Sequence, residues 1–463
     1  MSFSDKTPDL NTDVEQVAVD INDHEDQNEV FKTHVEGENY RTVSWYSSFA
    51  LMFKVLFSVG VLSIPGVFAY VGALPGALLV IGWGLFNTYQ AFILGAFRLR
   101  HPGMHGLQDM AYIVGGAWYR ELVGILYVVG YTLVTGSGLI GTATAFNALS
   151  EHGACTVWFS FVALIISTAV AAFPKFGQIG IVAWIGVTLL YIAVLVLTIA
   201  VGVQDRPFLA PEGVTDYGYQ VVASGTTFIT GMSASLIIFV SSSGTSAFIP
   251  IIAEMKNPKE YKKPITAAMG LLNVTYLVVS LVVYRYCGIY IASPALGSAG
   301  TLIKKITYGI GLPGLLVSAI LCQHLAAKYF FVRILRGTEH LQKKTKTHWI
   351  TWLGSVILIG ILSFVIAEAI PFFSTLIGLV GALAYAPLAI VVPMTLWLYD
   401  FGHYRKGNLW KKALWAFHVL FIFIGLFMTV GGSYTMIQTI IDAYATGSVD
   451  RAFSCADNSG STQ

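Results

Sequence analysis

Charged residues are scarce in this sequence. Only 11% of its 463 residues are Asp, Glu, Lys or Arg, whereas a soluble globular protein has about 25%. Apolar residues account for 55%, and the mean hydropathy is +0.69. A soluble domain of this length needs more polar surface than the chain supplies. The composition therefore excludes an ordinary soluble enzyme and a disordered protein, and it indicates a membrane protein with many spans.

The sequence also has few cysteines and no recognisable catalytic pattern. Its four cysteines are too few for a disulfide-rich secreted module and include no Cys-x-x-Cys pair. A disulfide between Cys155 and Cys455 stays open, because pairing cannot be read from sequence. No nucleotide-binding loop, His-Glu-x-x-His motif or Ser/His/Asp pattern stands in a suitable context. We therefore expect no enzyme activity, no cofactor, no metal site and no nucleic-acid partner.

The charges that are present are unevenly distributed. Residues 1–44 hold 11 acidic and 3 basic residues, whereas the rest of the chain holds 14 acidic and 24 basic ones. The acidic segment has few apolar residues and no periodicity, so it is predicted to be a disordered tail. It also lacks the basic and apolar regions of a signal peptide.

Eleven apolar stretches are long enough to cross a bilayer as helices, which takes about 20 residues each. Period-2 alternation is absent, which argues against a membrane β-barrel. The predicted fold class is therefore all-α, a polytopic membrane protein with eleven transmembrane helices within residues 45–445 and a short tail at 446–463. The predicted spans are 45–70, 75–97, 121–149, 156–173, 178–201, 224–250, 264–284, 313–335, 349–367, 371–397 and 412–441.

Basic residues in the loops predict the orientation. If the N-terminus is cytosolic, the loops on the cytosolic side hold 17 Lys and Arg residues and the opposite loops hold 4. Positive charge concentrates on the cytosolic side of membrane proteins. We therefore predict a cytosolic N-terminus and, because the number of spans is odd, an extracytosolic C-terminal tail.

The first and sixth predicted spans contain stretches that favour an interruption of the helix. Residues 58–63 are rich in Ser and Gly and precede Pro65, which suits the first turn of a restarted helix, and residues 241–246 are all Ser, Gly or Thr. Spans five apart run in opposite directions, as an inverted repeat of five plus five spans requires. In such transporters, interrupted helices bind the substrate near the membrane midplane. The alternative is that the small residues only allow close helix packing.

The candidate substrate-binding residues lie in these two stretches and in the third span. Exposed backbone groups of the stretches are predicted to contact a zwitterion. In the third span a tyrosine hydroxyl is able to bond either the substrate or a neighbouring helix. The candidates are Ser58, Val59, Gly60, Val61, Phe239, Ser241, Ser242, Ser243 and Tyr131.

Four ionisable residues lie inside spans or at their ends, where function is the first hypothesis because burial of charge is costly. Lys54 lies nine residues into the first span, about 14 Å at helical rise. It is a coupling-ion candidate, and the alternative is a head group that reaches cytosolic water. His324 is a second coupling candidate or a structural imidazole. Glu254 is a gating candidate or an interfacial cap, and Lys328 is expected to extend to the cytosolic face.

Three segments carry a resemblance to a known family. Residues 40–45 read Tyr-Arg-Thr-Val-Ser-Trp, residues 60–65 read Gly-Val-Leu-Ser-Ile-Pro, and residues 251–258 read Ile-Ile-Ala-Glu-Met-Lys-Asn-Pro. Together they resemble the amino acid/auxin permease family, especially its fungal neutral amino acid permeases. The resemblance covers residues 38–445 and implies eleven spans, the leucine-transporter type of inverted repeat, and amino acid uptake usually driven by protons.

The chain departs from that family pattern in the first span. The family usually has Gly-x-Gly where this chain has Ser58 to Gly60, often has Asn where this chain has Leu51, and often has an aromatic residue where this chain has Gly66. A small residue after the proline widens the site or repacks the span. These departures leave the substrate range open.

The resulting hypothesis is a secondary active transporter that takes up neutral aliphatic and aromatic amino acids with protons, in the plasma membrane. Neither small-residue stretch contains an acidic residue, so a cationic side chain lacks a partner there. Sodium needs several oxygen ligands, but the eighth span lacks an adjacent Ser/Thr pair, and Ser318 is expected well to the outer side. The resemblance implies a fold whose sodium-coupled members hold a sodium ion between the first and eighth spans, and Lys54 is expected to replace that ion and to hold the two spans together. The alternatives are a vacuolar exporter of the same family and a non-transporting amino acid sensor, and no oligomeric state is predicted.

Overall fold

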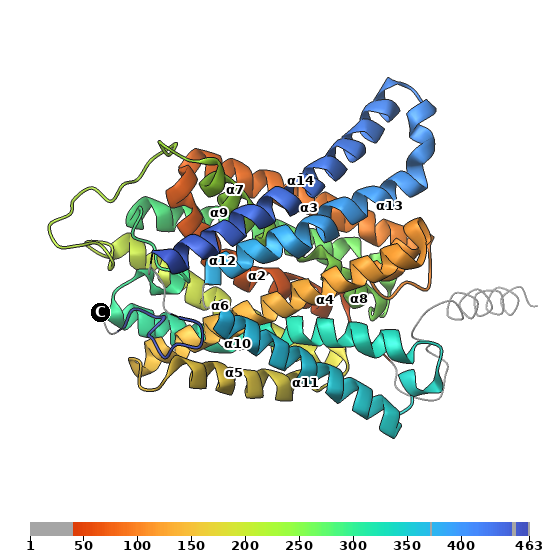
Figure 1. Ribbon diagram of the computed structural model, residues 1–463, viewed down its shortest axis with the longest axis horizontal. Coiled ribbons are helices and arrows are strands. Elements are labelled where there is room, and N and C mark those ends of the chain that lie inside the picture. The colour runs from red at the N-terminus through yellow and green to blue at the C-terminus, as the bar shows by residue number, and fades with distance from the viewer. Residues whose placement is uncertain (1–39, 371–372, 447–450, 462–463) are drawn as a thin grey trace, which may run out of the picture.

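A computed structural model of the chain describes residues 40–370, 373–446 and 451–461 (Figure 1). Most of the predicted acidic tail, residues 1–39, lies outside the described residues, as do 447–450 and 462–463 of the C-terminal tail. The described chain is built from helices: α2 (Trp45–Val71), α3 (Ala73–Arg100), α4 (Leu107–Ser150), α5 (Thr156–Ala171), α6 (Phe176–Val203), α7 (Phe228–Ser243), α8 (Phe248–Ala253), α9 (Lys262–Cys287), α10 (Thr301–Leu335), α11 (Lys346–Ala369), α12 (Phe373–Val380), α13 (Val392–Phe401) and α14 (Leu409–Ala445).

Every predicted span coincides with helical structure, although the count of eleven stays a prediction. Nine helical segments of the described chain are long and apolar enough to cross a membrane, and α12 with α13 makes a tenth if the pair is one span bent by 42°. The remaining segment, α5, has 16 residues, which is shorter than a usual span. The helices α4 and α10 begin earlier than predicted, because α4 continues through a kink at Gly116 and α10 carries Pro313 without ending.

Only one of the two predicted interruptions is present. In the sixth span, α7 ends at Ser243, a 3-10 turn follows at η1 (Gly244–Ala247), and α8 completes the span. The predicted interruption at residues 58–63 is wrong, because α2 is one continuous helix that includes Pro65. An interruption that the sequence did not predict lies in the tenth span, where the π-helical turns η5 (Gly381–Tyr385) and η6 (Pro387–Val391) separate α12 from α13.

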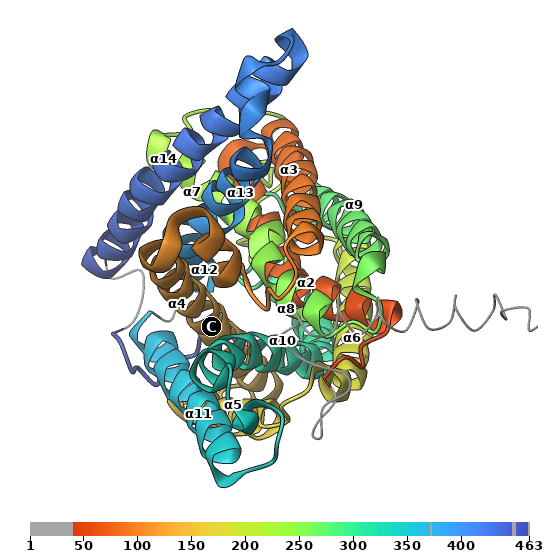
Figure 2. The same ribbon diagram turned by 90° about the vertical axis from the view of Figure 1, so that its right-hand side faces the viewer.

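The first and sixth spans form the core of the bundle. In the most apolar stretch of α2, 94% of the residues are buried, and the value is 100% for α7 with α8 but only 17% for α14. Viewed along the bundle, α2, α8 and α10 lie near the middle, α14 lies at the outside, and α5 and α11 lie on the opposite side (Figure 2). A site shielded from lipid therefore has to be built from α2, α7, α8 and their neighbours.

The two ends of the bundle are fastened differently. We call the end of the bundle where α2 begins and α3 ends the Arg98 end, after Arg98 in the last turn of α3. Val43, Glu254 and Lys328 also lie at this end. There the chain before α2 pairs with the chain after α8, since Val43 N–H donates to Glu254 O at 3.0 Å and Lys256 N–H donates to Val43 O at 2.9 Å. The opposite end, which lies on the left in Figure 1 together with the C-terminus, is called the disulfide end.

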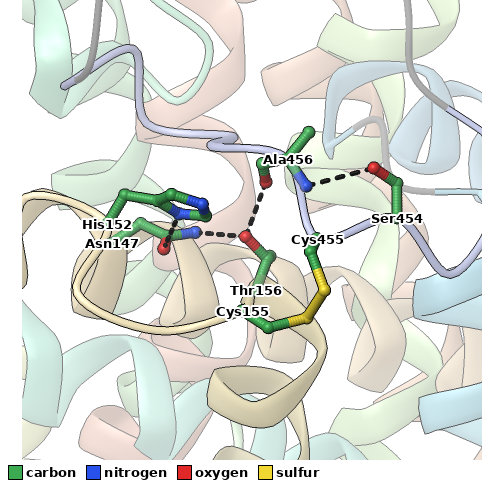
Figure 3. Close-up of a disulfide and its surroundings, with 7 residues drawn as sticks. All are labelled: Asn147, His152, Cys155, Thr156, Ser454, Cys455 and Ala456. Atoms are coloured by element: carbon green, nitrogen blue, oxygen red, sulfur yellow. Dashed lines mark hydrogen bonds between the residues drawn. A yellow bond between two sulfur atoms is a disulfide. The ribbon is translucent and has the colours of Figure 1, made fainter.

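A disulfide between Cys155 and Cys455 binds the C-terminal tail to the disulfide end (Figure 3). The pairing that the sequence leaves open is therefore formed. Next to it, Thr156 Oγ1 donates to Ala456 O at 2.6 Å and accepts a hydrogen bond from Asn147 Nδ2 at 2.7 Å (Figure 3). The tail thus fastens the end of α4 to the start of α5.

Candidate functional site

The interruption of α7 is stabilised by a hydroxyl group from α4. At Ser243 the backbone leaves helical geometry, with φ −96° and ψ 0°, so the carbonyl groups near it need other partners. Tyr131 OH donates to Gly244 O at 3.2 Å and lies 2.9 Å from Ser246 Oγ. The predicted residue Tyr131 therefore reaches the interruption, and its contact with a substrate stays a prediction.

Some hydrogen-bonding groups around the interruption are unused. Asn87 of α3 donates from Nδ2 to Ser242 Oγ at 2.8 Å. In contrast, Asn87 Oδ1, Ser243 Oγ and Thr245 Oγ1 are buried and have no hydrogen-bond partner within the described part of the chain. Buried polar groups are normally paired, so these three atoms are available to a polar ligand.

The helix α2 lies close to the interrupted span at Gly60. Tyr276 of α9 donates its hydroxyl to Leu56 O of α2 at 2.8 Å and lies 3.1 Å from Ser241 O of α7. A Cβ atom at Gly60 would lie 2.3 Å from the Tyr276 hydroxyl oxygen and 2.7 Å from Ser241 Cβ. Only glycine fits where these three helices meet.

The other predicted substrate-binding residues differ in what they offer. Ser58 and Val61 are buried in α2, whose amides stay in helical hydrogen bonds, so the predicted backbone contact from α2 is unavailable in this conformation. The Val59 side chain lies outside the described residues. Ser241 Oγ donates at 2.7 Å to a carbonyl of its own helix, and Phe239 is fully buried.

Lys54 connects α2 to α10. Its Nζ donates to Ser318 Oγ at 2.5 Å, and Ser318 Oγ donates to Gly314 O at 3.1 Å. The expectation that Ser318 lies well to the outer side of the eighth span is wrong, because α10 runs from Thr301 to Leu335 and Ser318 lies near its middle, in contact with Lys54. The alternative in which the lysine head reaches cytosolic water is also wrong for this conformation, since Lys54 is 0% exposed. The structure contains the predicted link between the first and eighth spans.

A buried ion pair closes the Arg98 end. Glu254, just after α8, is paired with Lys328 of α10, and both side chains are at most 1% exposed. Lys328 Nζ also donates to Pro174 O at 2.9 Å and lies 4.8 Å from the centre of the Tyr40 ring. The expectation that Lys328 extends to water is wrong, because these partners offset the cost of burying its charge. Burial and the nearby Glu254 carboxylate raise the pKa of Tyr40 above its usual value, so Tyr40 stays neutral.

His324 packs on another side of α10. Helix positions are about 100° apart, so His324 is about 120° around the axis from Ser318. Its ring centre lies 5.0 Å from that of Trp352 in α11. This position, away from the contact of α10 with α2, favours the structural alternative for His324.

A cavity of about 270 Å³ lies between the crossing at Gly60 and the disulfide end. Its walls come from the second half of α2, from α7, from the loop at 289–293 and from the start of α12, and no charged residue is among the described residues that line it. Ser293 Oγ and Ser374 Oγ lie 2.7 Å apart at its edge. The cavity is therefore apolar with a few hydroxyl groups.

Three residues of this region were not found from the sequence. Asn87 is one of two side-chain amides, with Gln90, in the apolar stretch 75–97, and Thr245 belongs to the small-residue run 241–246, so the sequence contained a reason to consider both. Tyr276 had none, because an aromatic residue within an apolar span looks like an ordinary core residue.

Known proteins with similar sequences are transporters. Residues 41–438 match the family described as transmembrane amino acid transporter protein. The chain is 42% identical over 436 residues to a transmembrane transporter of Gibberella moniliformis, a match that covers 94% of this chain and 92% of the relative. It is 30% identical over 423 residues to the N amino acid transport system protein of Neurospora crassa, covering 90% and 89% of the two chains.

Solved structures of transporters have the same fold. The chain superimposes on MhsT in complex with L-phenylalanine with a TM-score of 0.55 at 13% identity, covering 86% of this chain and 100% of the other. A Na+-coupled sialic acid symporter in a substrate-bound outward-open state gives a TM-score of 0.53 at 13% identity, covering 88% and 92%. These likenesses confirm the predicted leucine-transporter-like fold. The chain belongs to the family of transmembrane amino acid transporters.

Proposed function

We propose that this transporter takes up neutral aliphatic and aromatic amino acids together with protons, by alternating access, across the plasma membrane. The observation that carries the proposal is the interruption of α7, around which three buried hydrogen-bonding atoms have no partner among the described residues. The hydrogen bonds described around it involve hydroxyl, amide and carbonyl groups and no carboxylate. A cationic side chain would lose its hydration there without gaining an opposite charge.

The unused groups suit the two ends of a zwitterion. In this proposal the substrate carboxylate accepts hydrogen bonds from the hydroxyls of Ser243 and Thr245, and its ammonium group donates to Asn87 Oδ1. The hydrogen bond from the Tyr131 hydroxyl to Gly244 O stabilises the non-helical backbone that makes this contact possible. Binding also requires α2 to move away from Tyr276, because the crossing at Gly60 is closed in this conformation.

Lys54 is proposed to replace a coupling cation. Its protonated ammonium donates to Ser318 Oγ and thereby holds α2 against α10. When the site opens to one side, Nζ is able to give its proton to water, and the neutral amine then binds α10 less strongly. One proton would accompany each cycle, with no bound metal ion.

The Arg98 end is proposed to face the cytosol. The excess of Lys and Arg in the loops of this end supports that orientation. The disulfide of Cys155 and Cys455 supports it too, because it then lies on the extracytosolic side, where disulfides persist. The pair Glu254–Lys328 is then the cytosolic gate.

Uptake by proteoliposomes tests the proposal. We expect leucine and phenylalanine to accumulate when a pH gradient is imposed and choline replaces sodium, and we expect arginine, lysine and glutamate not to compete. Dependence on sodium would overturn proton coupling. Binding without accumulation would support the sensor, and accumulation driven only out of an acidic compartment would support the vacuolar exporter.

Two variants test the residues. Lys54→Met is expected to abolish pH-driven accumulation, and Lys305→Met, which removes an exposed lysine at the disulfide end, is its matched control.

Gly60→Val is expected to abolish uptake although the protein reaches the membrane. Gly82→Val is the control, because Gly82 lies on the exposed side of α3 and a Cβ there meets no atom within 4 Å.

A further inference from the structure

One residue of α2 that lines the 270 Å³ cavity is a glycine and contributes no side chain to it. Gly66 of α2 lines the cavity, and a Cβ atom built on it meets no atom within 4 Å. At Gly60 of the same helix, a Cβ atom would collide with Tyr276 at 2.3 Å. The absence of a side chain is thus required by helix contact at Gly60, whereas at Gly66 it leaves space.

The cavity lies on the way from the disulfide end to the interruption of α7. The six residues between Gly60 and Gly66 correspond to about 9 Å along α2. Two residues of its lining, Tyr70 and Ile289, are 57% and 55% exposed. The close contact of Gly60 with Tyr276 lies further along α2, toward the Arg98 end. A molecule that enters from the disulfide end therefore meets the cavity first.

The walls suit an uncharged side chain of amino-acid size. Leu62, Val67, Ile237 and Ile291 supply apolar surface, and the described lining contains no charged residue. The volume is just below the roughly 300–1,000 Å³ of typical small-molecule pockets. An apolar side chain gains about 25 cal/mol per Å² when it is buried here, whereas a charged one loses hydration without compensation.

We propose that this cavity holds the side chain of a neutral amino acid before the substrate reaches α7, and that Gly66 is the specificity-determining residue that sets the largest side chain admitted. The inference rests on the proposed function. A bulkier residue at position 66 narrows the cavity without touching the hydrogen-bonding groups at Asn87, Ser243 and Thr245.

A series of side-chain sizes tests the role of Gly66. Gly66→Leu is expected to raise KM for phenylalanine about tenfold or more relative to KM for alanine. Gly66→Ala is expected to raise KM for phenylalanine in the same direction but by less. Gly82→Leu on the exposed side of α3 is the matched control. Removing bulk from another residue of the cavity lining with Ile291→Ala is expected to restore phenylalanine uptake to Gly66→Leu, which separates a steric effect from misfolding. An equal loss for alanine, leucine and phenylalanine would overturn the inference.

Labelling of a thiol tests occupancy without transport. Among the described residues the free cysteines, Cys287 and Cys322, are buried, so Gly66→Cys adds an accessible thiol. We expect phenylalanine, but not lysine, to slow the reaction of this thiol with a methanethiosulfonate reagent, and unchanged labelling overturns the inference.

The failure of the inference and the failure of the proposed function are distinguishable. If the parent accumulates amino acids but KM for phenylalanine relative to alanine does not change across the size series, Gly66 does not determine specificity. If the parent accumulates none, the proposed function fails instead.

Discussion

The two ends of this transporter are closed by different chemistry. At the Arg98 end, a buried ion pair and two backbone hydrogen bonds join the chain before α2 to α8 and α10. At the disulfide end, a covalent bond fixes the tail, whose described contacts reach α4, α5, α10 and α11. Noncovalent contacts are able to break and re-form in each cycle, whereas a disulfide persists in an oxidising environment. We therefore propose that the Arg98 end opens during the cycle, whereas the tail holds together helices that do not separate.

The strongest way to break this contrast is to remove one member of the buried ion pair. Glu254→Leu leaves the Lys328 ammonium buried without its counter-charge, which costs about 3–5 kcal/mol of folding free energy. We expect a large drop in the unfolding temperature in detergent and loss of uptake. The double variant Glu254→Leu with Lys328→Met is the control, because replacing the whole pair by apolar groups is expected to recover most of the stability. A single variant as stable as the parent would contradict the role of the pair.

Removing the disulfide is expected to affect stability but not transport. Cys155→Ser should lower the free energy of unfolding by about 2–5 kcal/mol, and uptake should persist, because the tail holds neither α2 nor α7 in the contacts described. Cys455→Ser should have the same effect, and the double variant should add nothing, since both changes remove one bond. Additive losses, or uptake abolished in a well-folded variant, would show that the tail takes part in the cycle.

The sequence was sufficient for the parts of this comparison that depend on local pattern. Apolar length placed a helix at every predicted span, and the run 241–246 located the interruption after Ser243. Both features follow from hydrophobicity and the permissiveness of small residues. The contact of Lys54 with the eighth span was predicted from the resemblance to sodium-coupled transporters, whose sodium ion would sit close to Lys54, and it exists at Ser318.

The remaining features depend on which helices meet, and the sequence could not supply that. The stretch 58–63 is rich in small residues but stays helical, although the Tyr276 hydroxyl donates to Leu56 O just before it, whereas the run 241–246 is interrupted where Tyr131 donates to Gly244 O. Lys328 and Glu254 are 74 residues apart and pair only because α8 ends beside α10. Small residues therefore permit an interruption of a helix without requiring one.

A pH scan sharpens the comparison with a smaller effect. His105 is buried in the loop before α4 at the Arg98 end, and burial, followed by the charges of Lys328, Arg336 and Arg98, holds its pKa well below the usual 6.5. The unfolded chain binds a proton below pH 6.5 while the folded chain does not, so stability should fall as the pH drops below that value, by up to about 1.4 kcal/mol per pH unit.

The control for this scan is a neutral side chain of similar size. His105→Gln should remove this part of the pH dependence of the unfolding temperature between pH 5 and pH 6.5. It should leave the effect of a reductant, which acts at the opposite end, unchanged. An unaltered acid slope in His105→Gln would show that another group takes up the proton.

The smallest effect is expected from an ion pair at the disulfide end that is exposed. Lys305 Nζ lies 2.5 Å from Glu151 Oε1, but the two side chains are 37% and 59% exposed, so water and salt screen their attraction. The hydrogen bond and charge of Lys305 lower the pKa of Glu151 below its usual 4.5. Whatever the pair contributes is therefore present above pH 4.5 and lost as the pH falls through the lowered pKa. Glu151→Leu is the matched partner of Glu254→Leu, and its unfolding temperature at pH 7 should differ little from that of the parent. Because the charges are the same and only burial differs, an equally large loss in both variants would show that burial does not distinguish the two ends.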